Sequence, residues 1–317
     1  MSVNPFLADS LSLWMSSSTP EVDFSELNPK QFLGVPVALI AAVFLSFGAQ
    51  YQSRGLNKVE NITGHKAASG LKWSHIRELM RRPSWVVGTL LLGMAVALQL
   101  VSLTLSPLIV VQPLGVVAMV ITAVLNAKVS GVKTNHATRV SIGLSVIGVS
   151  IFVLIAAFTA RTVPVTTQKL ITLLVLFAIM LAVFGTLFLI FRHKAVALVY
   201  IVGAGAIYGF VATFAKAVIQ RFEQHEVDWL TGLVVVALVV GTILGMSFVQ
   251  NAYSSGPPDL VVAGLTVIDP LVAVLIGIVV LEEISYAPLW AVIGFIASGI
   301  IAIIGVLGLA KYHPQTS

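Results

Sequence analysis

An aspartate and a proline stand together in the middle of a long apolar run, TVIDPLVAV, over residues 266–274. Asp269 is the twelfth residue of the apolar segment that starts near Pro258, so we place it near the centre of a bilayer, where a charge costs about 3 kcal/mol. Pro270 has no backbone N–H and frees the carbonyl of Thr266, four residues earlier. These groups predict a broken helix and a site for a proton, a metal ion or a substrate ammonium group. The structural alternative is that protonated Asp269 hydrogen-bonds to a neighbouring helix and Pro270 only kinks the packing.

A second polar residue precedes a proline in the same way. Gln112 and Pro113 lie within an apolar segment, and Pro113 frees the carbonyl of Ile109. We expect the Gln112 amide to face Asp269 across a cavity. Other long amides in apolar segments either bind a ligand or join helices by hydrogen bonds, which is the commoner role: Gln50, Gln99, Gln250 and Asn251.

Lys216 ends a stripe of small residues at helical spacing (Gly205, Gly209 and Ala212). It could attract an anionic substrate or the carboxylate of Asp269. It also lies near the end of its segment, and we expect its ammonium group to snorkel to the membrane surface.

The remaining titratable residues give weak signals. Glu282 and Glu283 follow an apolar segment and either gather cations at a pore mouth or, as we expect, are simply solvated. The six histidines are expected in solvated loops, without metal-site spacing: His65, His75, His136, His193, His225 and His313. The sequence has no cysteine and no H-E-x-x-H, G-x-x-x-x-G-K-[ST] or G-x-S-x-G signature. We therefore expect neither an enzyme nor an ATP-driven pump, and no cofactor.

The elements that carry these residues are predicted to be membrane-spanning helices. Of 317 residues, 58% are hydrophobic and only 10% charged, against about 25% charged in a soluble domain. The net charge of +5 comes from loops, so a lipid bilayer and not a nucleic acid is the expected partner. An all-α multi-pass protein is predicted, with nine apolar segments near 33–53, 84–104, 107–127, 140–160, 170–191, 195–219, 229–251, 258–281 and 288–310.

The basic residues predict the orientation of these helices. Thirteen Lys and Arg residues fall on one side and four on the other. Because cytoplasmic loops are enriched in Lys and Arg, we expect the N-terminus outside and the C-terminus in the cytoplasm, in a plasma (cell inner) membrane.

Internal similarity predicts an inverted repeat. VQPLGVVAMVITAVLNAK (111–128) aligns without gaps with IDPLVAVLIGIVVLEEIS (268–285), which pairs Gln112 with Asp269 and Pro113 with Pro270. The offset of five helices is odd, so the two halves have opposite orientations, as in alternating-access transporters. The predicted organisation is an acidic N-terminal arm (1–32), a first repeat (33–160) with a basic cytoplasmic loop (54–83), a linker helix (161–194), a second repeat (195–310) and a tail (311–317).

Three stretches carry a resemblance to a known family: AGAIYGFVATFAKAV (204–218), LTLSPLIVVQPLGVVAMVITAVLNAKVS (103–130) and the second copy around VIDPL. Together they resemble the drug/metabolite transporter superfamily. The nine-helix plan is similar to its NIPA-like magnesium-transporter branch. This chain differs from what we expect of that branch by Asp269 before the proline and by Gly256, Pro257 and Pro258 in the preceding turn.

These observations lead to one expected function and two alternatives. We expect a secondary transporter that moves a small metabolite or drug-like cation by alternating access, with proton coupling through Asp269. One alternative is transport of magnesium or another divalent cation, with Asp269 as a metal ligand. The other is a membrane scaffold or an accessory of lipid or envelope assembly. G-x-x-x-G spacings such as GAIYG (205–209) allow either a homodimer or close packing within one chain.

Overall fold

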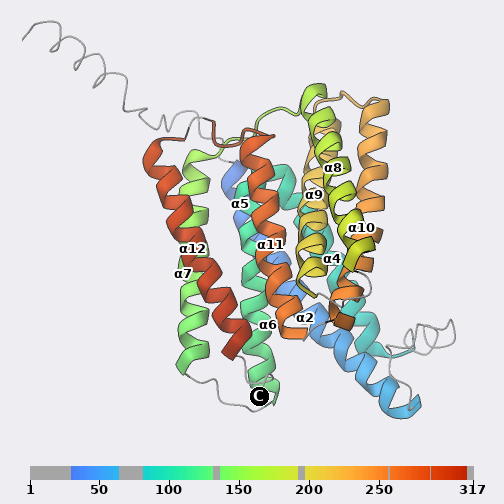
Figure 1. The fold of residues 1–317 in the computed structure, drawn as a ribbon. Coiled ribbons are helices and arrows are strands. Elements are labelled where there is room, and N and C mark those ends of the chain that lie inside the picture. Colours follow the sequence, from blue (N-terminus) through green and yellow to red (C-terminus); the bar gives the residue numbers. More distant parts are fainter. Residues whose placement is uncertain are drawn as a thin grey trace, which may run out of the picture.

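The structure is a computed structural model that describes residues 30–63, 81–130, 136–191, 197–255, 258–285 and 287–312. Its regular elements in these ranges are helices (Figure 1), and together they form nine segments that are long and apolar enough to cross a membrane. This confirms the prediction of an all-helical multi-pass membrane protein. The elements are α2 (Lys30–Thr63), α4 (Pro83–Leu105), α5 (Leu108–Val111), the 3-10 turn η3 (Gln112–Leu114), α6 (Gly115–Ser130), α7 (His136–Thr159), α8 (Thr167–Phe191), α9 (Ala197–Glu223), α10 (Trp229–Ser255), α11 (Pro258–Val279) and α12 (Leu289–Tyr312). The third span consists of α5, η3 and the first part of α6, over Leu108–Leu125.

Helix starts follow ordinary local rules. Pro83 and Pro258 are the first residues of α4 and α11, where a missing N–H costs nothing. Asp228 precedes α10, and its carboxylate accepts a hydrogen bond from the backbone N–H of Thr231 at 2.9 Å. The sequence therefore marks several boundaries directly.

Small residues allow α7 and α12 to pack closely along their length (Figure 1). A Cβ atom added at Gly305 would lie 2.3 Å from the backbone nitrogen of Ser145, and one added at Gly148 would lie 2.5 Å from that of Ala302. Only glycine fits at these positions, because any Cβ atom would clash with the backbone of the facing helix. Such close approach of backbones is a main source of helix association within a membrane.

The same device joins α9 to α11. A Cβ atom at Gly205 would lie 2.7 Å from the Cβ of Ile268, and one at Gly209 would lie 2.8 Å from the Cβ of Val272. The GAIYG face is therefore used within the chain. A homodimer, which stays a prediction, would need another face.

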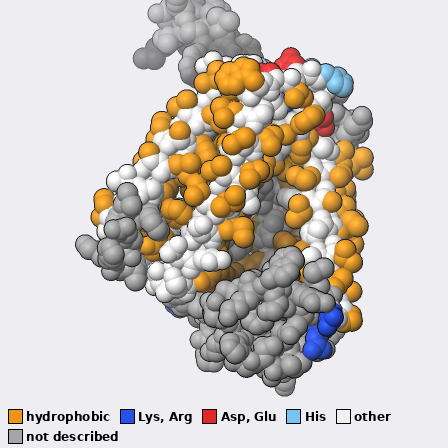
Figure 2. All heavy atoms as spheres, turned by 90° about the vertical axis from the view of Figure 1, so that its right-hand side faces the viewer, with side chains coloured by type: hydrophobic (Ala, Val, Ile, Leu, Met, Phe, Trp, Pro, Cys, Tyr) orange, Lys and Arg blue, Asp and Glu red, His pale blue; other side chains and the backbone are white. Residues whose placement is uncertain are grey.

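Helix α9 is central and α8 is peripheral. The most apolar stretch of the α9 span is 61% buried in the protein, whereas that of α8 is 17% buried. Hydrophobic side chains cover much of the outer surface, as contact with lipid requires (Figure 2). On the face shown there, Asp and Glu side chains lie at one end and Lys and Arg at the other.

The two proline sites differ in structure. The first repeat narrows to a 3-10 turn at Gln112–Leu114, whereas α11 continues as one α-helix through Pro270. The predicted break at Pro270 is wrong, because proline removes one hydrogen bond and the turns on both sides still hold the helix. The Thr266 hydroxyl donates to the carbonyl of Val262 at 2.7 Å, which adds a local bond just before the proline.

Candidate functional site

A cavity of about 400 Å³ lies among α2, α4, η3, α6, α9 and α11. Its polar wall brings together four residues singled out in the sequence (Gln99, Gln112, Thr266 and Asp269), together with Tyr208. Pro270 completes this part of the wall, while alanines and leucines of α2 and α4 form much of the rest. We call it the Asp269 cavity.

Asp269 is the acidic residue of this wall, and its carboxyl group lacks a full set of partners. Its Oδ1 atom is buried and has no hydrogen-bond partner within the described part of the chain. An unsatisfied buried acceptor costs about 1–3 kcal/mol, so such groups are rare without a functional reason. The geometry leaves this oxygen ready for a proton or a ligand.

Gln112 lines the same cavity from the opposite repeat, as the sequence alignment predicts. The residue after each of these two positions has a different environment. Pro113 lies outside the Asp269 cavity, whereas Pro270 borders both it and a second cavity on the far side of α11. Within the 3-10 turn, Gln112 therefore faces the Asp269 cavity and Pro113 faces the second cavity.

Three other predicted ligand residues lie outside the lining of this cavity. Gln50 is half-buried on α2, and Gln250 is exposed on α10. The amide nitrogen of Asn251 donates to the carbonyl of Ser247 in its own helix at 2.8 Å. None of these three residues lines the Asp269 cavity.

Tyr208 was missed in the sequence, although it lies in the GAIYG stripe. Its ring packs over Gly245 of α10, where an added Cβ atom would lie 2.9 Å from the ring. The signal available was a hydroxyl-bearing ring between the two glycines of GAIYG. The glycine that makes room for it is on another helix, and no sequence spacing joins these two residues.

Lys216 lies away from the Asp269 cavity, at the end of the bundle where α4 ends and α5 begins. We call this the α4–α5 end. The prediction that Lys216 snorkels is wrong, because its side chain is fully buried. Its ammonium group donates to the carbonyls of Leu103 and, at 2.8 Å, Ser106. The last carbonyls of a helix lack intrahelical donors, and a cation there is favourable.

Glu283 performs the matching role at the start of α5. It is 2% exposed, so the prediction of a solvated side chain is wrong for this residue. Its two carboxylate oxygens accept hydrogen bonds from the backbone N–H groups of Leu108 at 2.8 Å and Ile109 at 2.9 Å. Burial raises the pKa of the Glu283 carboxyl, while the charge of Lys216 and these two hydrogen bonds lower it by less. A buried cation and a buried anion thus satisfy the two helix ends that meet here.

Glu282 and Lys169 extend the charged cluster at the same end. Glu282 is exposed and has a positive φ of 62°, and it pairs with the ammonium of Lys169 at 3.0 Å. The same ammonium donates to the carbonyl of Leu281 at 3.0 Å. Lys169 therefore ties the start of α8 to the turn that follows α11.

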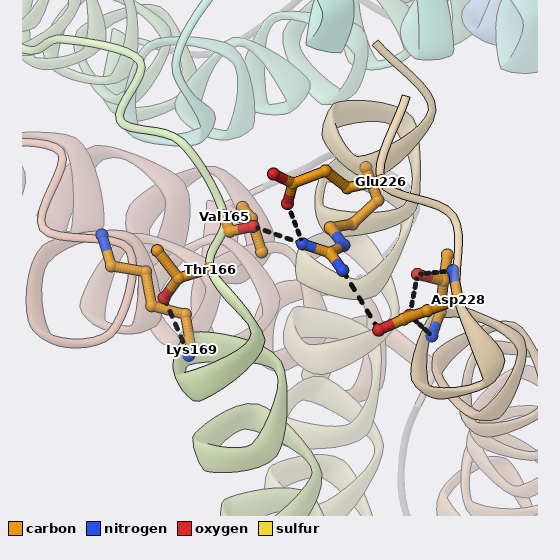
Figure 3. A network of polar contacts seen from close by, with 7 residues as sticks. Val165, Thr166, Lys169, Glu226 and Asp228 are labelled. Carbon is orange, nitrogen blue, oxygen red and sulfur yellow. Dashed lines mark hydrogen bonds and ion pairs between the residues drawn. The ribbon is translucent and has the colours of Figure 1, made fainter. Parts of the chain in front are cut away.

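A third set of ionic contacts surrounds Arg221 near the end of α9, and Figure 3 labels its partners Val165, Glu226 and Asp228. Its guanidinium donates to Glu226 at 2.5 Å, to Asp228 at 3.2 Å and to the carbonyl of Val165 at 3.3 Å. The hydrogen bonds from Thr231 hold the pKa of Asp228 below its usual range, and the charge of Arg221 adds to this effect. These contacts fix α9, α10 and the segment before α8 to one another.

A second cavity, of about 350 Å³, lies between η3, α6, α7, α11 and α12. Its lining is almost entirely apolar and includes Phe152, Phe295 and Gly299. It meets the Asp269 cavity at Thr266 and Pro270, which border both. We call it the Gly299 cavity.

Comparison with known proteins gives one relative to report. An uncharacterized protein of Corynebacterium glutamicum is 24% identical over 287 residues, which cover 88% of this chain and 95% of that protein. No family model matches the chain, and no solved structure matches it.

Proposed function

We propose that this membrane protein is a secondary transporter of a small solute, with Asp269 as the group that binds a proton or the solute. The observation that carries this proposal is the buried, unpartnered Oδ1 of Asp269 in a cavity of about 400 Å³. Functional ionisable residues inside membranes characteristically face such cavities. A volume of this size suits a small organic molecule.

The helix contacts support an inverted repeat. Packing of α2 on α4 corresponds to packing of α9 on α10, and contact of α2 with α6 corresponds to contact of α9 with α11. The closely packed α7 and α12 correspond to each other. This pattern is what two halves related by a two-fold axis would show, and it favours membership of the drug/metabolite transporter superfamily.

The two halves are packed unequally around the cavity. The first repeat contributes walls from both α2 and α4, whereas α9 contributes Tyr208 alone and lies directly against α11 through Gly205 and Gly209. Alternating access requires the cavity to open to one side of the membrane while the other side is closed, which inverted repeats achieve by adopting two different arrangements. In this proposal the two repeats exchange these arrangements during transport.

The chemistry at Asp269 follows from the cost of an isolated charge. A buried carboxylate without a partner is unfavourable by several kcal/mol or more, so it must hold a proton or contact a cation. A solute cation and a proton would then compete for the same oxygen atoms. Competition of this kind couples the movement of one to the opposite movement of the other.

Magnesium transport is the second candidate. Within the described ranges, no three His, Asp or Glu side chains come together as a metal site. Magnesium would therefore be held by Asp269, neighbouring amide oxygens and retained water, which is a known mode for this ion. A scaffold, in contrast, has no need of a polar cavity at mid-membrane.

The test uses proteoliposomes with pyranine and a magnesium indicator inside. Wild type, Asp269→Asn and the control Glu282→Gln, an acid outside the cavity, are compared while magnesium chloride or an organic cation is added outside. Proton movement driven by an organic cation, lost in Asp269→Asn and kept in Glu282→Gln, is the expected result. A rise of internal magnesium that depends on Asp269 would establish the second candidate. Equal behaviour of all three proteins would refute both.

A further inference from the structure

The two cavities differ in chemistry although they touch. The Asp269 cavity has a carboxyl group, amides and a phenol in its wall, whereas the Gly299 cavity offers almost only hydrocarbon. Consecutive residues separate them, since Gln112 faces the first and Pro113 the second. A molecule that filled both would need a polar part and an apolar part joined at the level of Thr266 and Pro270.

The Gly299 cavity also borders the lipid. Several side chains in its lining are at the same time among the most exposed apolar residues of α11 and α12: Leu271, Leu275, Ile296 and Ile300. Exposed apolar side chains on a membrane-spanning helix contact acyl chains. A hydrocarbon chain can therefore enter this cavity sideways from the bilayer without crossing a polar surface.

The charge of the Asp269 cavity selects the polar part. Asp269 contributes a carboxyl group, and no Lys or Arg of the described chain lines this cavity. An anionic head group would find no counter-charge, whereas an ammonium group would be complementary to the unpartnered Oδ1 atom.

We propose that the solute is a single-chain cationic amphiphile, whose ammonium head occupies the Asp269 cavity while its hydrocarbon chain occupies the Gly299 cavity. This inference rests on the proposed transport function and names its substrate class. Together the cavities have a volume within the usual range of ligand pockets, about 300–1,000 Å³.

Two glycines allow each cavity to be filled separately. A Cβ atom added at Gly299, or at Gly115 in the Asp269 cavity, meets no other atom within 4 Å. Gly232 of α10 has the same open surroundings, lines neither cavity and serves as a control. Because leucine favours helix more than glycine does, the three Leu variants should all fold.

The experiment measures proton movement in proteoliposomes driven by alkyltrimethylammonium ions, from tetramethylammonium to the decyl compound. Calcein retention checks that the liposomes stay intact. Partitioning into the bilayer is the same for every protein, so differences between variants report the cavities.

We expect Gly299→Leu to raise the KM for the decyl compound about tenfold, the loss of contact for about two methylene groups. The same variant should leave the KM for tetramethylammonium unchanged. Gly115→Leu should weaken transport of every chain length, and Gly232→Leu should match wild type.

An equal effect of Gly299→Leu on short and long compounds would overturn the inference, and so would no effect on either. If the wild type moves none of these compounds but moves protons with another solute through Asp269, the amphiphile is wrong and the transporter stands. If no solute moves protons in any variant, the transport proposal itself fails.

Discussion

Lys216 and Glu283 offer a quantitative test of what holds the α4–α5 end together. Lys216→Met keeps an apolar stem of similar length and removes the ammonium group. Two charge-assisted hydrogen bonds, to the carbonyls of Leu103 and Ser106, are lost. At about 1.5 kcal/mol each, their loss lowers the free energy of unfolding by about 3 kcal/mol.

Glu283→Gln removes one of two acceptor oxygens. The remaining amide nitrogen faces a backbone N–H, so one of the Leu108 and Ile109 donors is left without an acceptor. This change should cost about 2 kcal/mol. Because the two charges interact, the double variant should lose less than the sum of the single changes, by about 0.5–3 kcal/mol.

The assay is equilibrium unfolding in mixed micelles with increasing dodecyl sulfate, followed by tryptophan fluorescence. Arg139→Met, at an exposed position near the start of α7, is the control and should stay within about 0.5 kcal/mol of wild type. If Lys216→Met also stays within that range, the buried ammonium contributes nothing and the reasoning is refuted. Strict additivity of the double variant would show that the two charges act independently.

Three further predictions concern pH and packing. Burial raises the pKa of Glu283, so the contribution of this residue to stability is full below its unfolded pKa and is lost as the pH rises through its folded pKa. Glu283→Gln should remove this part of the pH dependence of the free energy of unfolding. Asp228 has a lowered pKa, so its contribution to stability is present above its unfolded pKa near 4 and is lost as the pH falls through its folded pKa. Asp228→Ala should remove this loss of stability at acid pH and lower the Tm. Asp228→Asn should keep most of the helix cap and lower the Tm less. Gly305→Leu should prevent the close approach of α7 and α12 and abolish the monodisperse peak in size-exclusion chromatography. Gly143→Leu should behave as wild type, because an added Cβ atom at Gly143 meets no atom within 4 Å. A normal elution profile of Gly305→Leu would show that the close contact is not required.

The helices and part of the cavity could be predicted from the sequence because their signals are local. An apolar run of the right length is enough to identify a span, and the sequence predicts each of the nine spans in the described part of the chain. The pairing of Gln112 with Asp269 followed from the internal alignment, and both line one cavity. Tyr208 was missed because its role depends on space that a glycine of another helix provides.

The charged cluster was mispredicted for a different reason. The partners of Lys216 and Glu283 are backbone groups at residues 103–109, more than 100 residues away in the chain. A backbone carbonyl or N–H has no letter of its own in a sequence. Only the ends of α4 and α5, once placed next to α9 and the turn after α11, reveal why two charges are buried there. The continuous path of α11 through Pro270 was mispredicted because the helical turns on both sides of the proline hold the helix together.

Under the proposed alternating-access mechanism, the contacts of buried Lys216 and Glu283 also bear on the populations of its two states. If these contacts exist only when the α4–α5 end is closed, about 3 kcal/mol favours the closed state by about 150-fold, and the empty protein spends less than about 1% of its time open at that end. A solute can shift such an equilibrium only by its difference in affinity for the two states. The strength of these contacts therefore sets the smallest difference in affinity by which a solute can open this end. A variant that weakens the contacts should open more often without any solute.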